Sequence, residues 1–168
     1  GEPMYLLLML SSITANYFFA LAINVCRQKN KLTISKVLLT LSVLSNLGCL
    51  LYFKYWSFLL SNINNAFSLN LTIKNIALPI GISFFTFQAM SYVIDVYRQN
   101  AKVQKNILNL ATYVALFPQL IAGPIVRYTT IEEELKTRKH TIEKFSLGVR
   151  RFCVGLGKKV LIANSLGE

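Results

Sequence analysis

Four long stretches of the chain carry no charged side chain: residues 4–26, 37–53, 75–94 and 106–126. A helix that crosses the ~30 Å hydrocarbon core of a bilayer needs about 20 predominantly apolar residues, and each stretch approaches that length. Three of the stretches predict transmembrane helices, at residues 4–26, 37–56 and 78–97. The pattern therefore predicts an all-α, multi-pass integral membrane protein, with residues 1–168 forming a single membrane unit.

The fourth stretch contains residues that break helices. Pro118 and the Gly123–Pro124 pair interrupt it near and past its middle. If residues 106–126 crossed the bilayer, the Lys- and Arg-rich part that follows would lie outside, against the tendency of cytoplasmic loops to collect these residues. A re-entrant segment at residues 106–126 satisfies both observations, because irregular backbone is tolerated at membrane depth where protein or water covers it. A simple crossing is the alternative.

Small and polar side chains form one stripe on the first predicted helix, where they recur every four residues: Ser12, Asn16, Ala20 and Asn24. In lipid such a stripe is expected to face neighbouring helices, which can approach closely and exchange hydrogen bonds there. Helix packing is the expected role of the stripe. A substrate path is the alternative.

The third predicted helix, residues 78–97, has an irregular beginning and a charged end. Pro79 and Gly81 predict a kinked or partly unwound outer end. At the inner end, Asp95 is expected to pair with Arg98 or Lys102, and a role in handling protons is the alternative.

The charged residues orient the chain. The basic residues between the first two predicted helices, with no acid among them, mark a cytoplasmic loop: Arg27, Lys29, Lys31 and Lys36. The second helix then runs outward and ends in aromatic residues typical of a membrane interface, and residues 61–70 are expected to form an external loop. The net charge is +11, from 18 Lys plus Arg against 7 Asp plus Glu. Because the bases lie between apolar stretches, this excess indicates membrane topology, and no nucleic-acid partner is expected.

Residues 142–164 predict a basic amphipathic helix. Its apolar face comprises Phe145, Val149, Phe152, Leu156 and Val160. Such a helix is expected at the inner membrane surface or along the cytoplasmic edge of the protein. The preceding residues, 129–144, are expected to form a polar connector, with Thr141 at the start of the helix.

No constellation of catalytic residues is apparent. The only histidine, His140, lies in a run of charged residues without a partner that could orient it as a base. The three cysteines have no ligand spacing, so neither a metal nor a bound cofactor is expected. By themselves, the residues establish a membrane scaffold with one irregular turn, and they do not establish a reaction.

Three stretches together resemble one family: residues 78–98 (LPIGISFFTFQAMSYVIDVYR), 116–128 (LFPQLIAGPIVRY) and 148–164 (GVRRFCVGLGKKVLIAN). The combination is similar to the membrane-bound O-acyltransferase (MBOAT) family, in the branch that acetylates alginate and other secreted polysaccharides. Residues 1–5 and 52–55 also resemble that branch. D-alanyl transferases that act on teichoic acid are similar relatives, and the Pro/Gly turn does not separate the two groups.

The resemblance implies helices around a tunnel in a bacterial inner membrane. An acetyl thioester or a relayed acyl group would be the co-substrate, and an acyl group, expected to be acetyl, would pass to hydroxyls of a polysaccharide such as alginate. Periplasmic or extracellular acyl-transfer proteins are possible partners. Five residues match the family and are expected to shape the tunnel wall: Pro118, Gln119, Gly123, Pro124 and Arg127. A structural break followed by an interfacial arginine is their alternative role.

Family members carry an essential histidine in a Trp-His-Gly segment downstream of the part represented here, and His140 does not match it. The chain begins at Gly1, and it is expected to be an internal fragment that is inactive alone. Two further readings remain open at this point, a transporter or channel subunit and a short membrane scaffold without chemistry.

Overall fold

The computed structural model describes residues 3–67, 78–79, 81–116, 126–136 and 140–167. Within these ranges every regular element is a helix, which confirms the all-α prediction. The chain divides into two compact units, Gly1–Glu133 and Glu134–Glu168, and each is described by itself. The predicted organisation as a single membrane unit stays a prediction.

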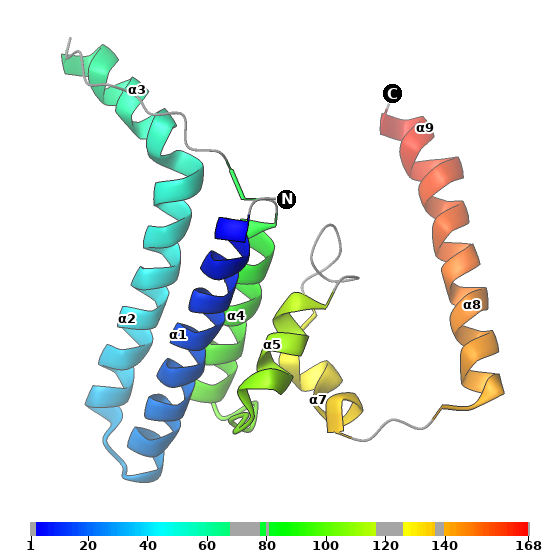
Figure 1. Ribbon diagram of the computed structural model, residues 1–168, viewed down its shortest axis with the longest axis horizontal. Coiled ribbons are helices and arrows are strands. Elements are labelled where there is room, and N and C mark those ends of the chain that lie inside the picture. Colours follow the sequence, from blue (N-terminus) through cyan, green and yellow to red (C-terminus); the bar gives the residue numbers. More distant parts are fainter. Residues whose placement is uncertain (1–2, 68–77, 80, 117–125, 137–139, 168) are drawn as a thin grey trace. The chain divides into compact units, whose positions relative to one another are not determined.

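Two long helices open the first unit (Figure 1). The first is α1 (Pro3–Gln28), and the second is a continuous helix made of α2 (Leu32–Leu50), the π-helical turn η1 (Leu51–Tyr55) and α3 (Trp56–Phe67). Within the described residues, two segments are long and apolar enough to cross a membrane, Tyr5–Gln28 and Leu32–Ala66. They correspond to the first two predicted spans.

The second helix is longer than predicted at both ends. It begins at Leu32 rather than at residue 37, because a lysine such as Lys36 can extend to water while its backbone stays helical. At the other end, residues 61–67 are helical rather than part of the predicted loop. The Asn62 side chain donates to the carbonyl of Phe58 at 2.9 Å, one turn back, so it bonds within the helix instead of opening a turn.

The turn between α1 and α2 is tight. Asn30 adopts the left-handed conformation with φ 53°. The amide of Lys31 donates to the carbonyl of Cys26 at 2.9 Å, and that of Asn30 donates to Arg27 at 3.1 Å. These bonds form a Schellman motif, which satisfies carbonyl groups at the end of α1 and lets α2 fold back beside it.

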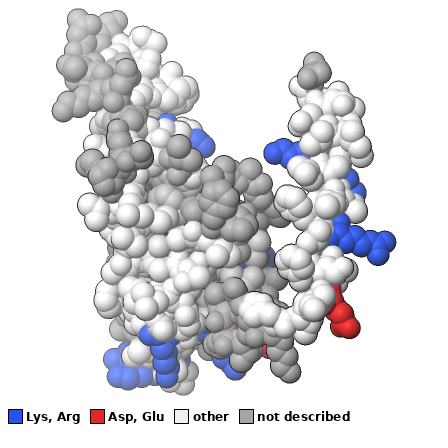
Figure 2. Space-filling view, turned by 45° about the vertical axis from the view of Figure 1, so that its right-hand side comes forward, with Lys and Arg blue, Asp and Glu red and all other residues white. Residues whose placement is uncertain are grey.

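Helices α1, α2 and α4 (Ile82–Tyr97) pack against one another as a three-helix bundle. Figure 1 shows α1 and α4 running in one direction and α2 in the other. Asn16 and Ala20 are buried, and Ser12 and Asn24 are half-buried, so the predicted stripe faces neighbouring helices. Lys and Arg gather at the end of the first unit that carries the α1–α2 turn (Figure 2).

The irregular start predicted for the third span is confirmed. Helix α4 begins at Ile82 rather than at residue 78, directly after Gly81 with φ 78°. Only glycine adopts this left-handed conformation without a steric cost, and the preceding Pro79 is buried. The helix has 16 residues, which corresponds to about 24 Å.

Two shorter helices complete the described part of the first unit. Helix α5 (Ile107–Ala115) packs on α1 and α4, and the Asn106 side chain caps it by accepting from the Leu108 amide at 2.9 Å. Helix α7 (Tyr128–Lys136) occupies part of the predicted polar connector. The sequence pattern assigned no secondary structure to this connector, and its run of glutamates favours a helix.

The second unit includes the last residues of α7, and from Ile142 it is one continuous helix made of α8 (Ile142–Gly157), the π-helical turn η2 (Lys158–Ala163) and α9 (Asn164–Gly167). Its predicted beginning is confirmed, since the Thr141 hydroxyl accepts from the Lys144 amide at 3.2 Å. Large apolar side chains along it are exposed, including Phe145 and Phe152. Its place at the membrane surface stays a prediction.

Candidate functional site

Four of the five residues predicted to shape the tunnel lie outside the described residues: Pro118, Gln119, Gly123 and Pro124. The fifth, Arg127, is exposed and directly precedes α7. Its carbonyl accepts from the Thr130 amide at 3.1 Å, which joins it to the first turn of that helix. The role of all five residues at a tunnel stays a prediction.

Three tyrosines from either side of residues 117–125 meet in a tyrosine cluster, which comprises Tyr92, Tyr113 and Tyr128. All three side chains are fully buried. The ring of Tyr128 lies edge-on to both others, with centroid distances of 5.0 Å to Tyr92 and 5.4 Å to Tyr113. Edge-to-face rings of this kind contribute about 0.5–1.5 kcal/mol per pair beyond the burial of their surface. The cluster therefore joins α4, α5 and α7.

Gln104 supplies polar partners to the cluster. Its backbone amide donates to the Tyr92 hydroxyl at 2.8 Å, and its side-chain amide donates to the Tyr128 hydroxyl at 2.8 Å. Its side-chain oxygen accepts from the Asn106 amide at 3.0 Å, directly before α5. Since a buried polar group without a partner costs about 1–3 kcal/mol, these bonds from one glutamine stabilise the burial of two tyrosine hydroxyls.

The cluster also fixes where the chain returns after α5. The Tyr113 hydroxyl, in the last turns of α5, donates to the carbonyl of Val126 at 2.7 Å. The side chain of Gln88 donates to the Tyr113 carbonyl at 3.3 Å, which ties the same turn to α4. Val126, the last residue of the predicted re-entrant stretch, is thus held against α5.

The sequence pattern did not indicate this cluster. Tyr92 and Tyr113 lie inside apolar stretches, where they resemble ordinary helix-packing residues, and Gln104 lies in a basic loop. Their one signal is that a buried tyrosine hydroxyl needs a hydrogen-bond partner, but the sequence does not show which partner.

The predicted ion pair of Asp95 does not form. Asp95 is 6% exposed, and its Oδ2 atom has no hydrogen-bond partner among the described residues. Arg98 lies just past the helix end and is exposed, while Gln99 turns the chain away with φ 63°. The backbone carbonyl of Asp95 instead accepts from Asn100 at 2.9 Å, so the turn is held by the main chain and not by an ion pair.

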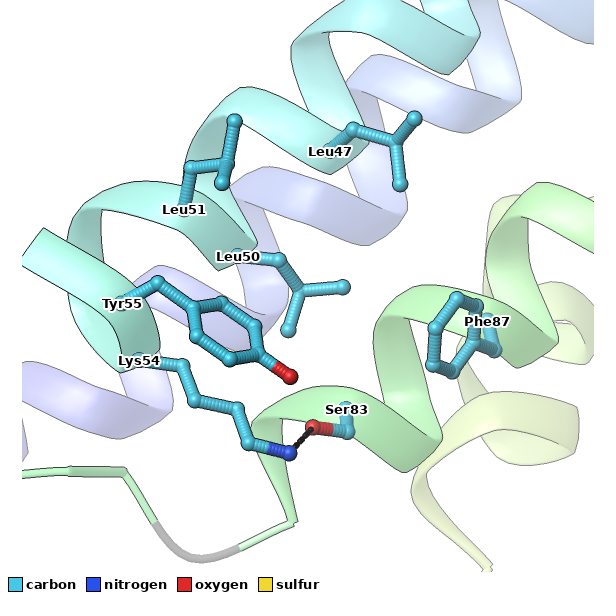
Figure 3. A pocket seen from close by; sticks show the side chains of 7 residues that line it. All are labelled: Leu47, Leu50, Leu51, Lys54, Tyr55, Ser83 and Phe87. Atoms are coloured by element: carbon cyan, nitrogen blue, oxygen red, sulfur yellow. Dashed lines mark hydrogen bonds between the residues drawn. The ribbon is translucent and has the colours of Figure 1, made fainter. Parts of the chain in front are cut away.

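A groove of about 220 Å³ opens between the second helix and α4 (Figure 3). Leucines line the side formed by α2 and η1, at positions Leu47, Leu50 and Leu51, and Phe87 faces them from α4. Lys54, Tyr55 and Ser83 contribute the polar atoms of the groove. The Lys54 ammonium donates to the Ser83 hydroxyl at 3.4 Å and lies 5.5 Å from the centre of the Tyr55 ring.

Similarity to known proteins extends over nearly the whole chain. It is 39% identical over 166 residues to the probable alginate O-acetylase AlgI of Pseudomonas syringae pv. tomato, which covers 96% of this chain and 32% of that protein. The probable alginate O-acetylase AlgI of Pseudomonas aeruginosa is 38% identical with the same coverage. The predicted membership of the membrane-bound O-acyltransferase family is confirmed.

A peptidoglycan O-acetyltransferase of Helicobacter pylori is also similar, at 32% identity over 188 residues, which cover 96% of this chain and 35% of that protein. The chain therefore spans about a third of the length of the curated relatives it matches. No family model matches it. No solved structure matches it either.

Proposed function

We propose that this chain forms part of a membrane O-acyltransferase that transfers an acyl group, expected to be acetyl, to hydroxyls of a secreted polysaccharide. The observation that carries the proposal is the similarity to alginate O-acetylases along 96% of the chain. The similar peptidoglycan O-acetyltransferase supports peptidoglycan as a second candidate acceptor beside alginate. Both acceptors present sugar hydroxyls to the same acyl-transfer chemistry.

The protein is proposed to lie in a bacterial inner membrane, with α1, the second helix and α4 as its first spans. Two apolar segments of sufficient length and the basic end seen in Figure 2 support this placement. With the basic end in the cytoplasm, the groove lined by Lys54 and Ser83 lies towards the outer surface. The amphipathic helix that begins at Ile142 is proposed to lie at the inner surface of the membrane.

The re-entrant geometry of residues 106–126 is part of the proposal. Helix α5 has nine residues and spans about 14 Å, less than half of the hydrocarbon core. The bond from Tyr113 to Val126 holds the returning chain against the helix that it left. A segment that turns within the membrane needs such covering contacts, and the tyrosine cluster provides them.

The chemistry is proposed by resemblance to the family. A histidine elsewhere in the full-length protein would deprotonate, or hydrogen-bond, the sugar hydroxyl as it attacks the carbonyl of the acyl donor. A dry tunnel would strengthen any dipole aimed at the developing oxyanion. In this scheme Pro118, Gln119, Gly123, Pro124 and Arg127 line the tunnel wall near that histidine, and the tyrosine cluster holds described residues on either side of residues 117–125.

Acetyl transfer by the full-length protein tests the proposal. Membranes that contain it, any partner proteins encoded beside it and an acetyl thioester are incubated with alginate or with peptidoglycan, and ester-bound acetate is measured. Acetate on either polymer supports the proposal and identifies the acceptor. Transfer of D-alanine to teichoic acid, or solute flux without acyl transfer, would contradict it. Residues 1–168 expressed alone are expected to transfer no acetate.

A further inference from the structure

The groove between the second helix and α4 combines an apolar wall with one cation. Leu47, Leu51 and Phe87 are each more than a third exposed there, so apolar surface is open in the described part of the chain. In Figure 3 the Lys54 ammonium and the Tyr55 hydroxyl both point towards α4, at the same end of the groove. A ligand that fits would be apolar along its length and polar at one end.

The charge of Lys54 is not neutralised by the described residues. Its contacts are the Ser83 hydroxyl at 3.4 Å and the face of the Tyr55 ring at 5.5 Å, both of which are neutral groups. Hydroxyls of Ser83 and Tyr55 beside an ammonium group can donate to the same anion. The polar end of the groove is therefore complementary to a negatively charged oxygen group, such as a phosphate.

The depth of Lys54 matches a lipid head group. At a rise of about 1.5 Å per residue, the helix carries Lys54 about 33 Å from Leu32, close to the ~30 Å thickness of the hydrocarbon core. Tyr52 and Trp56, which flank Lys54, are 50% and 42% exposed, as expected for aromatic residues at a membrane interface. The leucines of the groove then lie at the depth of the acyl chains.

We propose that this groove binds one phospholipid with an anionic head group from the outer leaflet of the membrane. Its phosphate contacts Lys54, with Tyr55 and Ser83 as further donors, and part of one acyl chain lies between Leu51 and Phe87. The groove volume of about 220 Å³ accommodates a chain segment rather than a polymer. The π-helical turn η1 forms the wall that carries both Lys54 and Tyr55, and such turns are frequent at functional sites.

The proposal rests on the membrane placement above but not on acyl transfer. Full-length protein is reconstituted into vesicles of phosphatidylcholine that contain a trace of photoreactive phosphatidylglycerol or photoreactive phosphatidylcholine, each with a diazirine on the acyl chain. After illumination, labelled peptides are identified by mass spectrometry. Phosphatidylglycerol is expected to label residues 47–55 and 83–87 about fivefold more than phosphatidylcholine does, as one lysine contributes about 1 kcal/mol at an anionic surface.

Three variants make the test specific. Lys54→Gln is expected to abolish the preference for phosphatidylglycerol, whereas Lys54→Arg keeps it. Lys36→Gln, on an exposed lysine of the same helix near its opposite end, is the matched control and is expected to change nothing at the groove. Because Lys54 is exposed, the variants are expected to insert as the wild type does, which sedimentation with the vesicles verifies.

Two outcomes overturn the proposal. Equal labelling of the wild type by both lipids, or a preference for phosphatidylglycerol that survives Lys54→Gln, would show that Lys54 does not recognise an anionic head group in the groove. Absence of label at the groove in protein that is fully inserted would show that another part of the protein, or a second copy, fills it. Acetyl transfer is measured on the same vesicles, so failure of lipid binding is distinguished from failure of the proposed function.

Discussion

The pair of buried asparagines between α1 and α2 makes a quantitative prediction. The Asn16 side chain donates to Asn46 at 3.0 Å, and the Asn46 side chain donates back at 2.8 Å. The hydroxyl of Ser42 adds a third bond to Asn16 at 3.2 Å. Asn16 and Asn46 are 2% and 4% exposed, so this cluster is the main polar link across the interface of the two helices.

The magnitude follows from known membrane hydrogen bonds. Such bonds average about 0.6 kcal/mol in double-mutant cycles, with a maximum of about 1.7 kcal/mol. The two reciprocal amide bonds are therefore expected to couple Asn16 and Asn46 by about 1–1.5 kcal/mol. Asn46→Ala leaves Asn16 bonded to the carbonyl of Ser12 at 2.9 Å and to Ser42, so the remaining amide is not orphaned. Each single substitution is expected to cost about 1–2 kcal/mol.

The measurement is the free energy of unfolding of the full-length protein in micelles, for wild type, Asn16→Ala, Asn46→Ala and the double variant. The control is Asn62→Ala, which removes the same side chain from an exposed position where it bonds only within its own helix. A coupling energy below about 0.3 kcal/mol, within the error of additivity, would refute the reasoning. Because alanine is the better helix former, Asn62→Ala is expected to cause no loss, and an equal loss there would show that the effect does not arise from the interhelical pair.

Further predictions concern the tyrosine cluster, the topology and the tunnel. Gln104→Met is expected to cost about 1–3 kcal/mol, since it removes the acceptor of the Asn106 amide and one hydrogen bond of the Tyr128 hydroxyl, whereas Gln104→Glu keeps the acceptor for Asn106. The same unfolding measurement checks this, and a loss below 0.5 kcal/mol for Gln104→Met would contradict it. Single cysteines in a cysteine-free background are expected to react with impermeant maleimide only from the inside at positions 31 and 139, and only from the outside at position 65. Reaction of positions 65 and 139 from the same side would contradict the re-entrant geometry. In the full-length enzyme, Gln119→Ala is expected to lower acetyl transfer about tenfold to a hundredfold at unchanged membrane abundance, as a displaced positioning group does. Unchanged transfer would exclude Gln119 from the site.

The pattern of apolar and polar residues predicted most of the helices and one of the faces through which they pack. The stripe that contains Asn16 and Ala20 predicted an interface, because side chains four residues apart share one helical face. The boundaries were less accurate. The second helix begins before Lys36, at Leu32, and continues beyond residue 61 to Phe67. Its backbone hydrogen bonds continue in both directions because no turn replaces them at the predicted boundaries. Both α1 and α4 end with a left-handed residue that is not glycine, Asn30 and Gln99, and neither end carries the usual glycine signal.

For the candidate site, the sequence indicated which residues could take part but not which side chains form hydrogen bonds with one another. The family motifs identified Pro118, Gln119 and Arg127, and similarity to alginate O-acetylases confirmed the family without testing their roles. The ion pair of Asp95 with Arg98 was wrong, because adjacency along a chain does not keep two side chains on one side of a helix that ends between them. Gln104 was missed because its partners come from α4 and α7, far apart in the sequence.

The sequence by itself determined that the chain is helical and to which family it belongs. The length of the apolar stretches, the helical period and the family motifs each depend only on residues that are close together in the sequence. Only the tertiary structure decided which polar atoms meet. The amide pair of Asn16 and Asn46, the glutamine that serves Tyr92 and Tyr128, and the groove that ends at Lys54 each join separate helices. Buried polar groups need partners, but their identity depends on helix directions and rotations that emerge only when the helices pack.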